Sequence, residues 1–262
     1  MYGDRRPGGR NYRWTLGAGG RSAAVNAAIN LYTVRDLDEP LPDLLERVAR
    51  VGYDGVEFAG LDVDPEAVRE KLDELDLAAT AAHVPIETLE EEFEATVDRY
   101  RTLNCERIAV PYLEESAFAS SESVDETARR LDELGERLAS QGLELHYHNH
   151  DHEFVDLEET TGFEALTERS SVGLELDLGW IEAAGADPVG LLERYADRVS
   201  LVHCKDTRSG TPVELGEGDL AIEACLDAAR EAGVEWLIYE HDAPDDPTES
   251  LETGVRTLRR QL

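Results

Sequence analysis

Short apolar strand patterns alternate eight times with amphipathic helical patterns from residue 27 onward, and this alternation limits the chain to few folds. The predicted strands are Ala28–Val34, Gly55–Phe58, Ala78–His83, Arg107–Tyr112, Leu143–His148, Val172–Leu178, Val199–Cys204 and Trp236–Glu240. The predicted helices between them are Leu41–Val51, Pro65–Leu75, Leu89–Leu103, Val124–Leu138, Pro188–Tyr195, Leu220–Ala232 and Glu249–Leu262. Eight such units in 262 residues favour a single (β/α)8 TIM barrel of the α/β class. An open doubly wound sheet is the runner-up, but no G-x-G-x-x-G motif follows an early strand.

The predicted domain division is a flexible N-terminal tail over residues 1–22 and a barrel catalytic domain over residues 23–262. The first twenty or so residues are rich in Gly and Arg and lack the apolar core of a signal peptide, so we expect a flexible tail or an over-extended start. Cys105, Cys204 and Cys225 are odd in number and show no C-x-x-C spacing, which favours buried thiols in a cytoplasmic protein.

The charge of the chain excludes several classes of partner. The formal net charge is −33, from 58 acidic against 25 basic residues, and only Lys71 and Lys205 are lysines. A uniformly acidic, lysine-poor surface is typical of proteins from salt-loving (halophilic) cytoplasms. We expect no nucleic-acid partner, since phosphate backbones require basic stripes, and no membrane span, since no apolar run approaches 18 residues.

Four of the seven histidines occupy alternate positions in the segment LELHYHNHDHEF, at residues 146, 148, 150 and 152. Alternate side chains of a strand share one face, so this segment predicts a column of imidazoles directed at one place. Imidazole is a common ligand of zinc, manganese, cobalt and iron. A histidine-rich loop without a metal is the alternative.

The other polar residues that interrupt apolar strands fall at the predicted carboxyl ends, where a TIM barrel carries its chemistry. Glu57 is expected either to contact substrate or to pair with an arginine inside the barrel mouth. His83 is either structural or part of the site. Asp177 lies nearer its strand end than Glu175, which is expected one layer deeper, holding a neighbouring side chain. Glu240 ends the last strand, with His241 facing away and Asp242 at the rim.

Lys205 alternates onto the same face as His203 in VSLVHCKD, in a chain that otherwise avoids lysine. We expect it to stabilise a substrate oxygen or an enolate, with a salt bridge to a barrel carboxylate as the alternative. Two imidazoles and two carboxylates from four successive strands, His148, Asp177, His203 and Glu240, predict one divalent metal ion. Such a mixed set with open positions favours Mn²⁺ or Co²⁺, with Zn²⁺ as the alternative.

These residues and motifs resemble the xylose isomerase-like barrels grouped as sugar phosphate isomerases/epimerases, over about residues 28–258. The resemblance rests on INLYTVR, GYDGVEFAG, YHNHDHEF, ELDLGWIEAAGADP, VHCKD, ELGEGDL and YEHD in this order. It implies a divalent metal held by His148, Asp177, His203 and Glu240, with a sugar or polyol chelating it. His83, Trp180 and Lys205 match positions that line the sugar pocket. Many relatives are homo-oligomers, and the oligomeric state of this chain is left open.

One departure from the family pattern bears on mechanism. The epimerases of the family have a glutamate where this chain has His148, and they use it and the strand-eight glutamate as acid and base on opposite faces of the sugar. A metal-bound imidazole cannot also take that proton, so a mechanism with one base, Glu240, is favoured. Glu153 either supplies the missing carboxylate or caps a helix.

The assigned catalytic residues are therefore Glu240, Lys205, His83 and Glu153, and the assigned substrate contacts are Glu57, His150 and Trp180. The expected function is a metal-dependent isomerase or epimerase acting on a sugar or keto-sugar through an enediolate. A dehydratase or β-eliminating lyase of the inosose dehydratase type, acting on a keto-polyol or 3-keto-glycoside, is the first alternative.

The same residues fit two other functions less well. A non-catalytic sugar-binding barrel is disfavoured because all four ligand positions carry competent donors. An endonuclease of the related metal-barrel type is disfavoured by the charge. The acidic LGEGD loop favours an unphosphorylated substrate.

Overall fold

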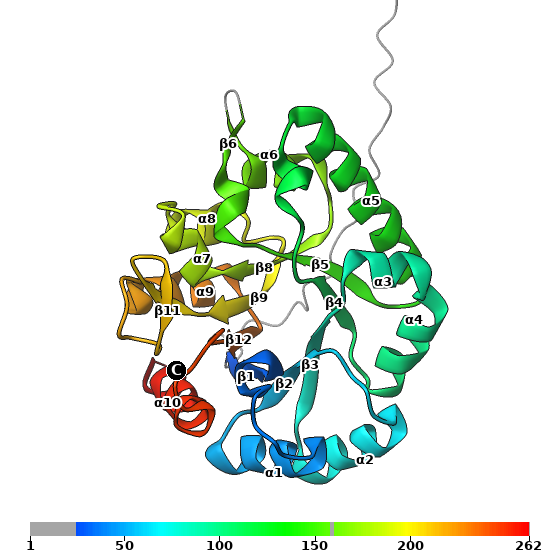
Figure 1. Cartoon of the computed structure of the whole chain (residues 1–262), viewed down its shortest axis with the longest axis vertical. Coiled ribbons are helices and arrows are strands. Elements are labelled where there is room, and N and C mark those ends of the chain that lie inside the picture. The colour runs from blue at the N-terminus through cyan, green and yellow to red at the C-terminus, as the bar shows by residue number, and fades with distance from the viewer. Residues whose placement is uncertain (1–24, 158–159, 262) are drawn as a thin grey trace, which may run out of the picture.

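The computed structural model describes residues 25–157 and 160–261, and in them eight parallel strands close into a barrel (Figure 1). The order around the barrel is β1-β12-β9-β8-β5-β4-β3-β2. The strands are β1 (Asn26–Asn30), β2 (Gly55–Ala59), β3 (Ala78–His83), β4 (Arg107–Val110), β5 (Glu144–His148), β8 (Gly173–Asp177), β9 (Val199–Cys204) and β12 (Trp236–Tyr239). This confirms the predicted (β/α)8 barrel and excludes the open sheet. The tail predicted over residues 1–22 lies outside the described residues.

Helices surround the barrel and cover the outward faces of its strands (Figure 1). They are α1 (Leu41–Val51), α2 (Pro65–Leu75), α3 (Ile86–Glu91), α4 (Phe93–Thr102), α5 (Ser121–Ser140), α6 (Gly162–Arg169), α7 (Leu178–Ala183), α8 (Pro188–Arg194), α9 (Ile222–Ala232) and α10 (Pro247–Gln261). Short 3₁₀ helices and two small hairpins complete the described chain: η1 (Leu31–Val34), η2 (Glu115–Phe118), η3 (Asp151–Phe154), β6 (Asp156–Leu157) with β7 (Thr160–Thr161), and β10 (Asp206–Arg208) with β11 (Thr211–Val213). Across the described residues, no helix combines the length and apolarity that a membrane span needs.

Several element boundaries differ from the prediction because polar side chains cap the backbone at strand ends. The first strand stops at Asn30 instead of Val34, since the Asn30 side chain accepts a hydrogen bond from Tyr32 N and starts η1. The sixth strand stops at Asp177, whose carboxylate accepts from Trp180 N and starts α7. The helix predicted over residues 89–103 is two helices, α3 and α4, because the backbone leaves helical geometry at Glu92.

The barrel interior is built in layers, because alternate residues of each strand point inward. A small apolar layer of Ala28, Ala81, Leu201 and Ile238 packs against Trp236. The polar residues at and just beyond the strand ends lie above this layer, toward the mouth. The larger apolar core lies between the barrel and its helices. The apolar layer therefore closes the barrel below the polar residues and leaves them open only at the mouth.

Among the described residues, the large apolar side chains that stay exposed all lie in connections at the carboxyl ends of barrel strands, on the side of the barrel mouth. They are Tyr32, Val63, Tyr112 and Val155, each 41% to 47% exposed. Each belongs to the connection that follows a barrel strand, namely β1, β2, β4 or β5. These four residues are called the apolar rim below.

Gly173 in β8 is predicted to be irreplaceable for packing inside the barrel. A Cβ at this position would lie 2.5 Å from two ring atoms of the buried His146. Gly173→Ala should lower the free energy of unfolding by about 1–3 kcal/mol, as overpacked core sites do. Urea unfolding measures the change. Glu231→Ala, at an exposed position of α9, is the control and should change stability little; equal effects of the two substitutions would contradict the packing argument.

Candidate active site

Three imidazoles and two carboxylates form a buried polar layer just inside the mouth, and this set is called the inner layer below. Its residues are Glu57 on β2, His83 on β3, His148 on β5, Glu175 on β8 and His203 on β9. The carboxylate oxygen Glu175 Oε2 lies 2.8 Å from His83 Nε2, 3.3 Å from His148 Nδ1 and 3.5 Å from His203 Nε2. Four strands thus direct polar groups at one point on the barrel axis.

Glu57 is the second anchor of the inner layer. Its Oε2 lies 2.6 Å from His203 Nε2 and accepts a hydrogen bond from Asn30 Nδ2 at 2.8 Å. The carboxylate is fully buried and has no arginine among its described partners, so the predicted Arg–Glu pair is wrong. Glu57 pairs with His203 and His83 instead, and its contact with substrate stays a prediction.

Burial and the neighbouring charges set the protonation of this layer. Burial, reinforced by Glu175, raises the pKa of Glu57 to about 7. Burial would also raise the pKa of Glu175, but His203 and His83 outweigh it and hold that pKa well below the usual range. Burial, with His203 nearby, lowers the pKa of His148 to about 3, which keeps its imidazole neutral and able to offer a lone pair.

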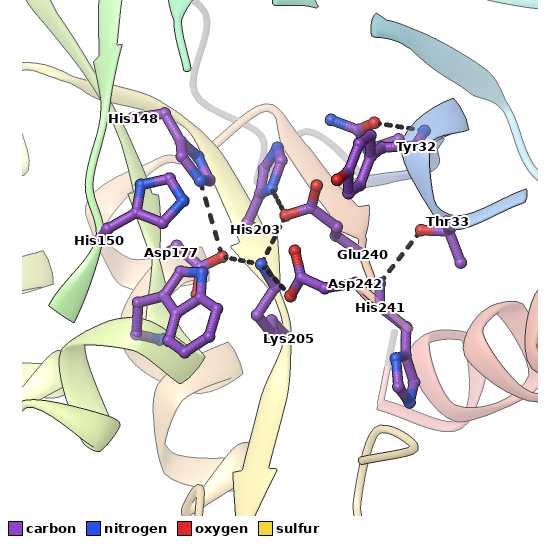
Figure 2. A network of polar contacts seen from close by, with 12 residues as sticks. Tyr32, Thr33, His148, His150, Asp177, His203, Lys205, Glu240, His241 and Asp242 are labelled. Atoms are coloured by element: carbon purple, nitrogen blue, oxygen red, sulfur yellow. Dashed lines mark hydrogen bonds and ion pairs between the residues drawn. The ribbon is translucent and has the colours of Figure 1, made fainter. Parts of the chain in front are cut away.

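A second group of charges, the outer group, consists of Lys205, Asp177, Glu240 and Asp242 at and just beyond the strand ends (Figure 2). Lys205, which directly follows β9, places its Nζ 3.1 Å from Asp177 Oδ2, 2.8 Å from Glu240 Oε2 and 2.8 Å from Asp242 Oδ2. Glu240 Oε2 also lies 2.9 Å from His203 Nδ1. Burial disfavours the ammonium, yet the three carboxylates, Asp177 foremost, raise the pKa of Lys205. The predicted alternative of a salt bridge to barrel carboxylates is therefore present.

The four predicted metal ligands converge. One donor atom from each of His148, Asp177, His203 and Glu240 lies within 4.8 Å of the other three. A second grouping within the same limit consists of His83, His148, Glu175 and His203. A donor set of two nitrogens and two carboxylate oxygens, in which Asp177 Oδ2 makes no hydrogen bond but lies 3.1 Å from the Lys205 ammonium, fits a divalent cation. That these residues bind a metal stays a prediction.

Backbone contacts fix the direction of Asp177. Its amide donates to Asn149 Oδ1 at 3.0 Å, and its carbonyl accepts from Asn149 Nδ2 at 3.3 Å. Its Oδ1 caps α7 through Trp180 N at 2.9 Å, which leaves Oδ2 directed at Lys205 and His148. Burial raises the pKa of Asp177 to about 6, while Lys205 opposes that shift.

Aromatic rings form one wall of the mouth. The His150 ring stacks near Trp180 at 5.9 Å between centroids and meets Tyr112 edge-on at 5.1 Å. Lys205 Nζ lies 4.8 Å from the centre of the Trp180 ring. Trp180 Nε1 and His150 Nδ1 are buried and lack hydrogen-bond partners within the described part of the chain. A flat apolar wall with unused polar atoms is suited to the faces and hydroxyls of a sugar.

The predicted column of four imidazoles is only partly formed, because β5 ends at His148. His146 lies deeper, with Nε2 3.5 Å from Glu144 Oε2. His150 is the residue before η3, and His152 turns away to bond the carbonyl of Leu113 at 2.9 Å. Of the four, His148 alone belongs to either of the two groupings of donor atoms found among the described residues.

Glu153 caps η3, which was the alternative to the catalytic role predicted for it. Its Oε1 accepts a hydrogen bond from His150 N at 2.8 Å, and burial raises the pKa of the carboxyl well above its usual range. It is absent from both groupings of convergent donors. This placement fits the cap better than the catalytic role assigned from the sequence.

The sequence reasoning missed three positions that hold the site together: Asn30, Asn149 and Asp242, the last of which was expected only at the rim. Asn30 orients Glu57, Asn149 holds the backbone of Asp177, and Asp242 is the third partner of Lys205. Asn149 directly follows the predicted strand Leu143–His148, and Asp242 lies two residues beyond Trp236–Glu240, so their place near strand ends was the available signal. Asn30 lies inside the predicted strand Ala28–Val34, so position gave no signal for it. His241, by contrast, points away as expected, with its amide bonded to Thr33 (Figure 2).

Comparisons with known proteins agree with the barrel fold. A family model described as "Xylose isomerase-like TIM barrel" matches residues 45–261. The rhizopine catabolism protein MocC of Rhizobium meliloti is 31% identical over 142 residues, covering 47% of this chain and 43% of that protein. An inosose dehydratase of Lactiplantibacillus plantarum is 26% identical over 269 aligned positions, covering 86% of this chain and 90% of that protein.

Among solved structures, a sugar phosphate isomerase/epimerase from Parabacteroides distasonis superposes with a TM-score of 0.80 at 20% identity. The superposition covers 90% of this chain and 94% of that chain. At this identity the likeness shows the shared fold.

Lys205 is predicted to be the main neutralising charge of the outer carboxylates when no metal is added. Lys205→Met leaves three acidic groups without their cation, so it should lower the free energy of unfolding of the metal-free protein by about 3–5 kcal/mol. Urea unfolding in the presence of EDTA measures this. Lys71→Met, at the other lysine of the chain, which contacts Glu46 and Glu74 at the surface, is the matched control and should have a much smaller effect. Similar losses in the two variants would contradict the assignment.

Proposed function

This chain belongs to the xylose isomerase-like TIM barrel family, and on that premise we propose that it is a divalent-metal-dependent dehydratase. Its proposed substrate is a keto-polyol or keto-sugar, from which it removes the proton α to the carbonyl and then eliminates water. The observation that carries the proposal is that the strands do not all bring the same kind of donor to the mouth. Strand β8, the end of β12 and their loops bring carboxylates to it, whereas β5 brings the imidazole of His148.

The metal would be held by His148, Asp177, His203 and Glu240. A bound divalent ion supplies Lewis acidity that makes the carbon next to a carbonyl more acidic. Two nitrogens and two oxygens with room for substrate oxygens favour Mn²⁺ or Co²⁺, with Zn²⁺ as the alternative.

Glu240 is the proposed base. Burial would raise the pKa of its carboxyl, but Lys205 and His203 outweigh burial and hold that pKa well below the usual range, so the carboxylate is ionised and able to accept a proton. Its Oε2 makes the contacts to His203 and Lys205. The other oxygen takes part in neither contact and can take the proton from the substrate.

Lys205 is the proposed stabiliser of the enolate oxygen. Its ammonium lies beside Glu240 at 2.8 Å, on the same side of the site as the base. His83, the other residue assigned to this role, bonds Glu175 at 2.8 Å in the inner layer, so Lys205 is the better placed of the two. Trp180 and His150 would hold the sugar face and its hydroxyls.

Dehydration follows if the enolate expels a hydroxyl from the β carbon. The proton that Glu240 removed then leaves with that hydroxyl as water, and a carbon–carbon double bond forms. Isomerisation follows if the proton returns to the neighbouring carbon. We favour dehydration because the arrangement offers one base and because relatives that align over most of their length are named inosose dehydratase. The symmetric use of two carboxylates in epimerisation lacks its second member here.

Two further properties belong to this proposal. The substrate is unphosphorylated, since the acidic residues around the mouth would repel a phosphate. The enzyme works at high salt, since the net charge of −33 needs screening. The assays below are therefore run in molar KCl.

Metal binding is the first test. Protein stripped with EDTA should regain about one Mn²⁺ or Co²⁺ per chain and be stabilised by about 2.7 kcal/mol at an ion concentration 100 times Kd. Elemental analysis and thermal unfolding measure these. Asp177→Asn keeps a helix-capping side chain but loses the ligand charge, so it should lose most of the stabilisation. The control is Glu214→Gln, which removes a carboxylate that contacts Tyr239 outside the site, and it should behave as wild type. A wild-type protein that binds no ion would contradict the metal proposal.

Removal of the base is the second test. Glu240→Gln should lower kcat for an inosose about 10²–10⁴-fold. Mass spectrometry in D₂O follows the product: a loss of 18 mass units with a new ultraviolet absorption indicates dehydration. Deuterium uptake without water loss indicates isomerisation and would overturn the favoured outcome. Wild-type turnover by Glu240→Gln that still binds metal would overturn the role of the base.

A further inference from the structure

The outer grouping (His148, Asp177, His203, Glu240) and the inner grouping (His83, His148, Glu175, His203) share two imidazoles. Each of these two rings has one nitrogen on the side of each grouping. His148 directs Nδ1 at Glu175 and Nε2 at Asp177, at 3.3 and 3.8 Å. His203 directs Nε2 at Glu57 and Nδ1 at Glu240, at 2.6 and 2.9 Å. The barrel could therefore hold one cation in the outer grouping, one in the inner grouping, or two bridged by the imidazoles.

The two shortest distances in the inner layer favour shared protons over a shared cation, whereas Glu175 Oε2 lies 3.3 Å from His148 Nδ1 and 3.5 Å from His203 Nε2. Donor atoms around a tetrahedral ion with bonds of about 2.0–2.2 Å lie roughly 3.3–3.6 Å apart. Glu57 Oε2 and His203 Nε2 are 2.6 Å apart, and Glu175 Oε2 and His83 Nε2 are 2.8 Å apart, which are hydrogen-bond distances. The layer is also fully buried apart from the 9% exposed side chain of His83.

One assignment of the protons turns an N–H of each imidazole of the inner layer toward a carboxylate. A neutral imidazole has one N–H and one lone pair. If the inward nitrogens carry the protons, His83, His148 and His203 each present N–H to a carboxylate. The outward nitrogen of His148 then carries a lone pair toward the metal grouping, and that of His203 does so once a cation replaces its 2.9 Å hydrogen bond to Glu240. His83 Nδ1 lies 3.4 Å from Asn30 Nδ2, whose amide orientation is fixed because Asn30 Oδ1 accepts from Tyr32 N.

We propose that Glu175 is the shared positioning residue of the metal site, and that the inner layer holds protons and no second cation. This rests on the proposed function insofar as the outer grouping binds a metal. Glu175 bonds His83 and is the carboxylate nearest to the inward nitrogen of His148, and it also lies 3.5 Å from His203. Removing its charge frees these rings to turn or to exchange tautomers. Glu57 bonds His203 of the two shared metal-ligand rings, so its removal should disturb fewer rings than the removal of Glu175.

The experiment compares metal binding of wild-type protein, Glu175→Gln, Glu57→Gln and Glu214→Gln by calorimetric titration with Mn²⁺ and by Co²⁺ absorption spectra. Wild type should bind one ion per chain. Glu175→Gln should still bind one ion, with affinity lower by about 10–100-fold, the usual loss when a carboxylate behind a histidine ligand is removed. Its Co²⁺ spectrum should shift, because the ligand rings reorient. Glu214→Gln should match wild type in affinity and spectrum.

A purely structural role is separated by unfolding of the metal-free proteins. Glu175→Gln removes a buried charge, so its metal-free stability should stay within the range of Glu57→Gln while its metal affinity falls further. If Glu175→Gln does not fold, the wild-type stoichiometry and Glu57→Gln still decide: two ions per wild-type chain overturn the proposal, and so does an affinity loss of more than about 100-fold in Glu57→Gln. Affinity within twofold of wild type in Glu175→Gln overturns the positioning role alone, whereas a wild type that binds no ion overturns the proposed function as well.

Discussion

The structure depends on mutual neutralisation of charges that the barrel buries. An unpaired ion in the interior costs several kcal/mol, and this barrel places Glu57 and Glu175 at full burial inside the ring of strands. They are tolerated because histidines from three other strands face them. The polar groups therefore hold the strand ends in register as much as the strands position the polar groups. The same argument applies at the strand ends, where Lys205 is the counter-ion of the carboxylates of Asp177, Glu240 and Asp242.

The sequence predicted the fold because periodicity depends on local backbone geometry. Each strand pattern and helix pattern lies within one element, and eight repeats of that order have few closed solutions. The boundaries were less predictable, since they depend on single capping side chains. Asn30 and Asp177 end their strands by accepting amide hydrogen bonds from the following turn. A polar residue at a strand end could be read as a ligand, a cap or both, and Asp177 is both a cap and a candidate ligand.

The sequence predicted which residues converge at the candidate site better than it predicted how far inside the barrel each one lies. Parallel strands bring their carboxyl ends together, so His148, Asp177, His203 and Glu240 could be grouped from position alone. Pairing inside the barrel could not be predicted, because it depends on inter-strand stagger. That stagger is irregular where β2 meets β3 and where β8 meets β9. Glu57 illustrates this: its position near a strand end resembles that of a site residue, yet it pairs with His203 inside the barrel. Glu153 caps η3, which was the alternative to its catalytic role.

The apolar rim has a consequence for how such a charged molecule receives a neutral ligand. Carboxylates and the salt around them hold the hydration layer tightly over most of the surface, while Tyr32, Val63, Tyr112 and Val155 offer water few hydrogen bonds. Water at the entrance is thus the easiest to displace. At the high salt proposed for the enzyme, where ions engage much of the solvent, uncharged molecules would lose water most readily on contact with these four side chains.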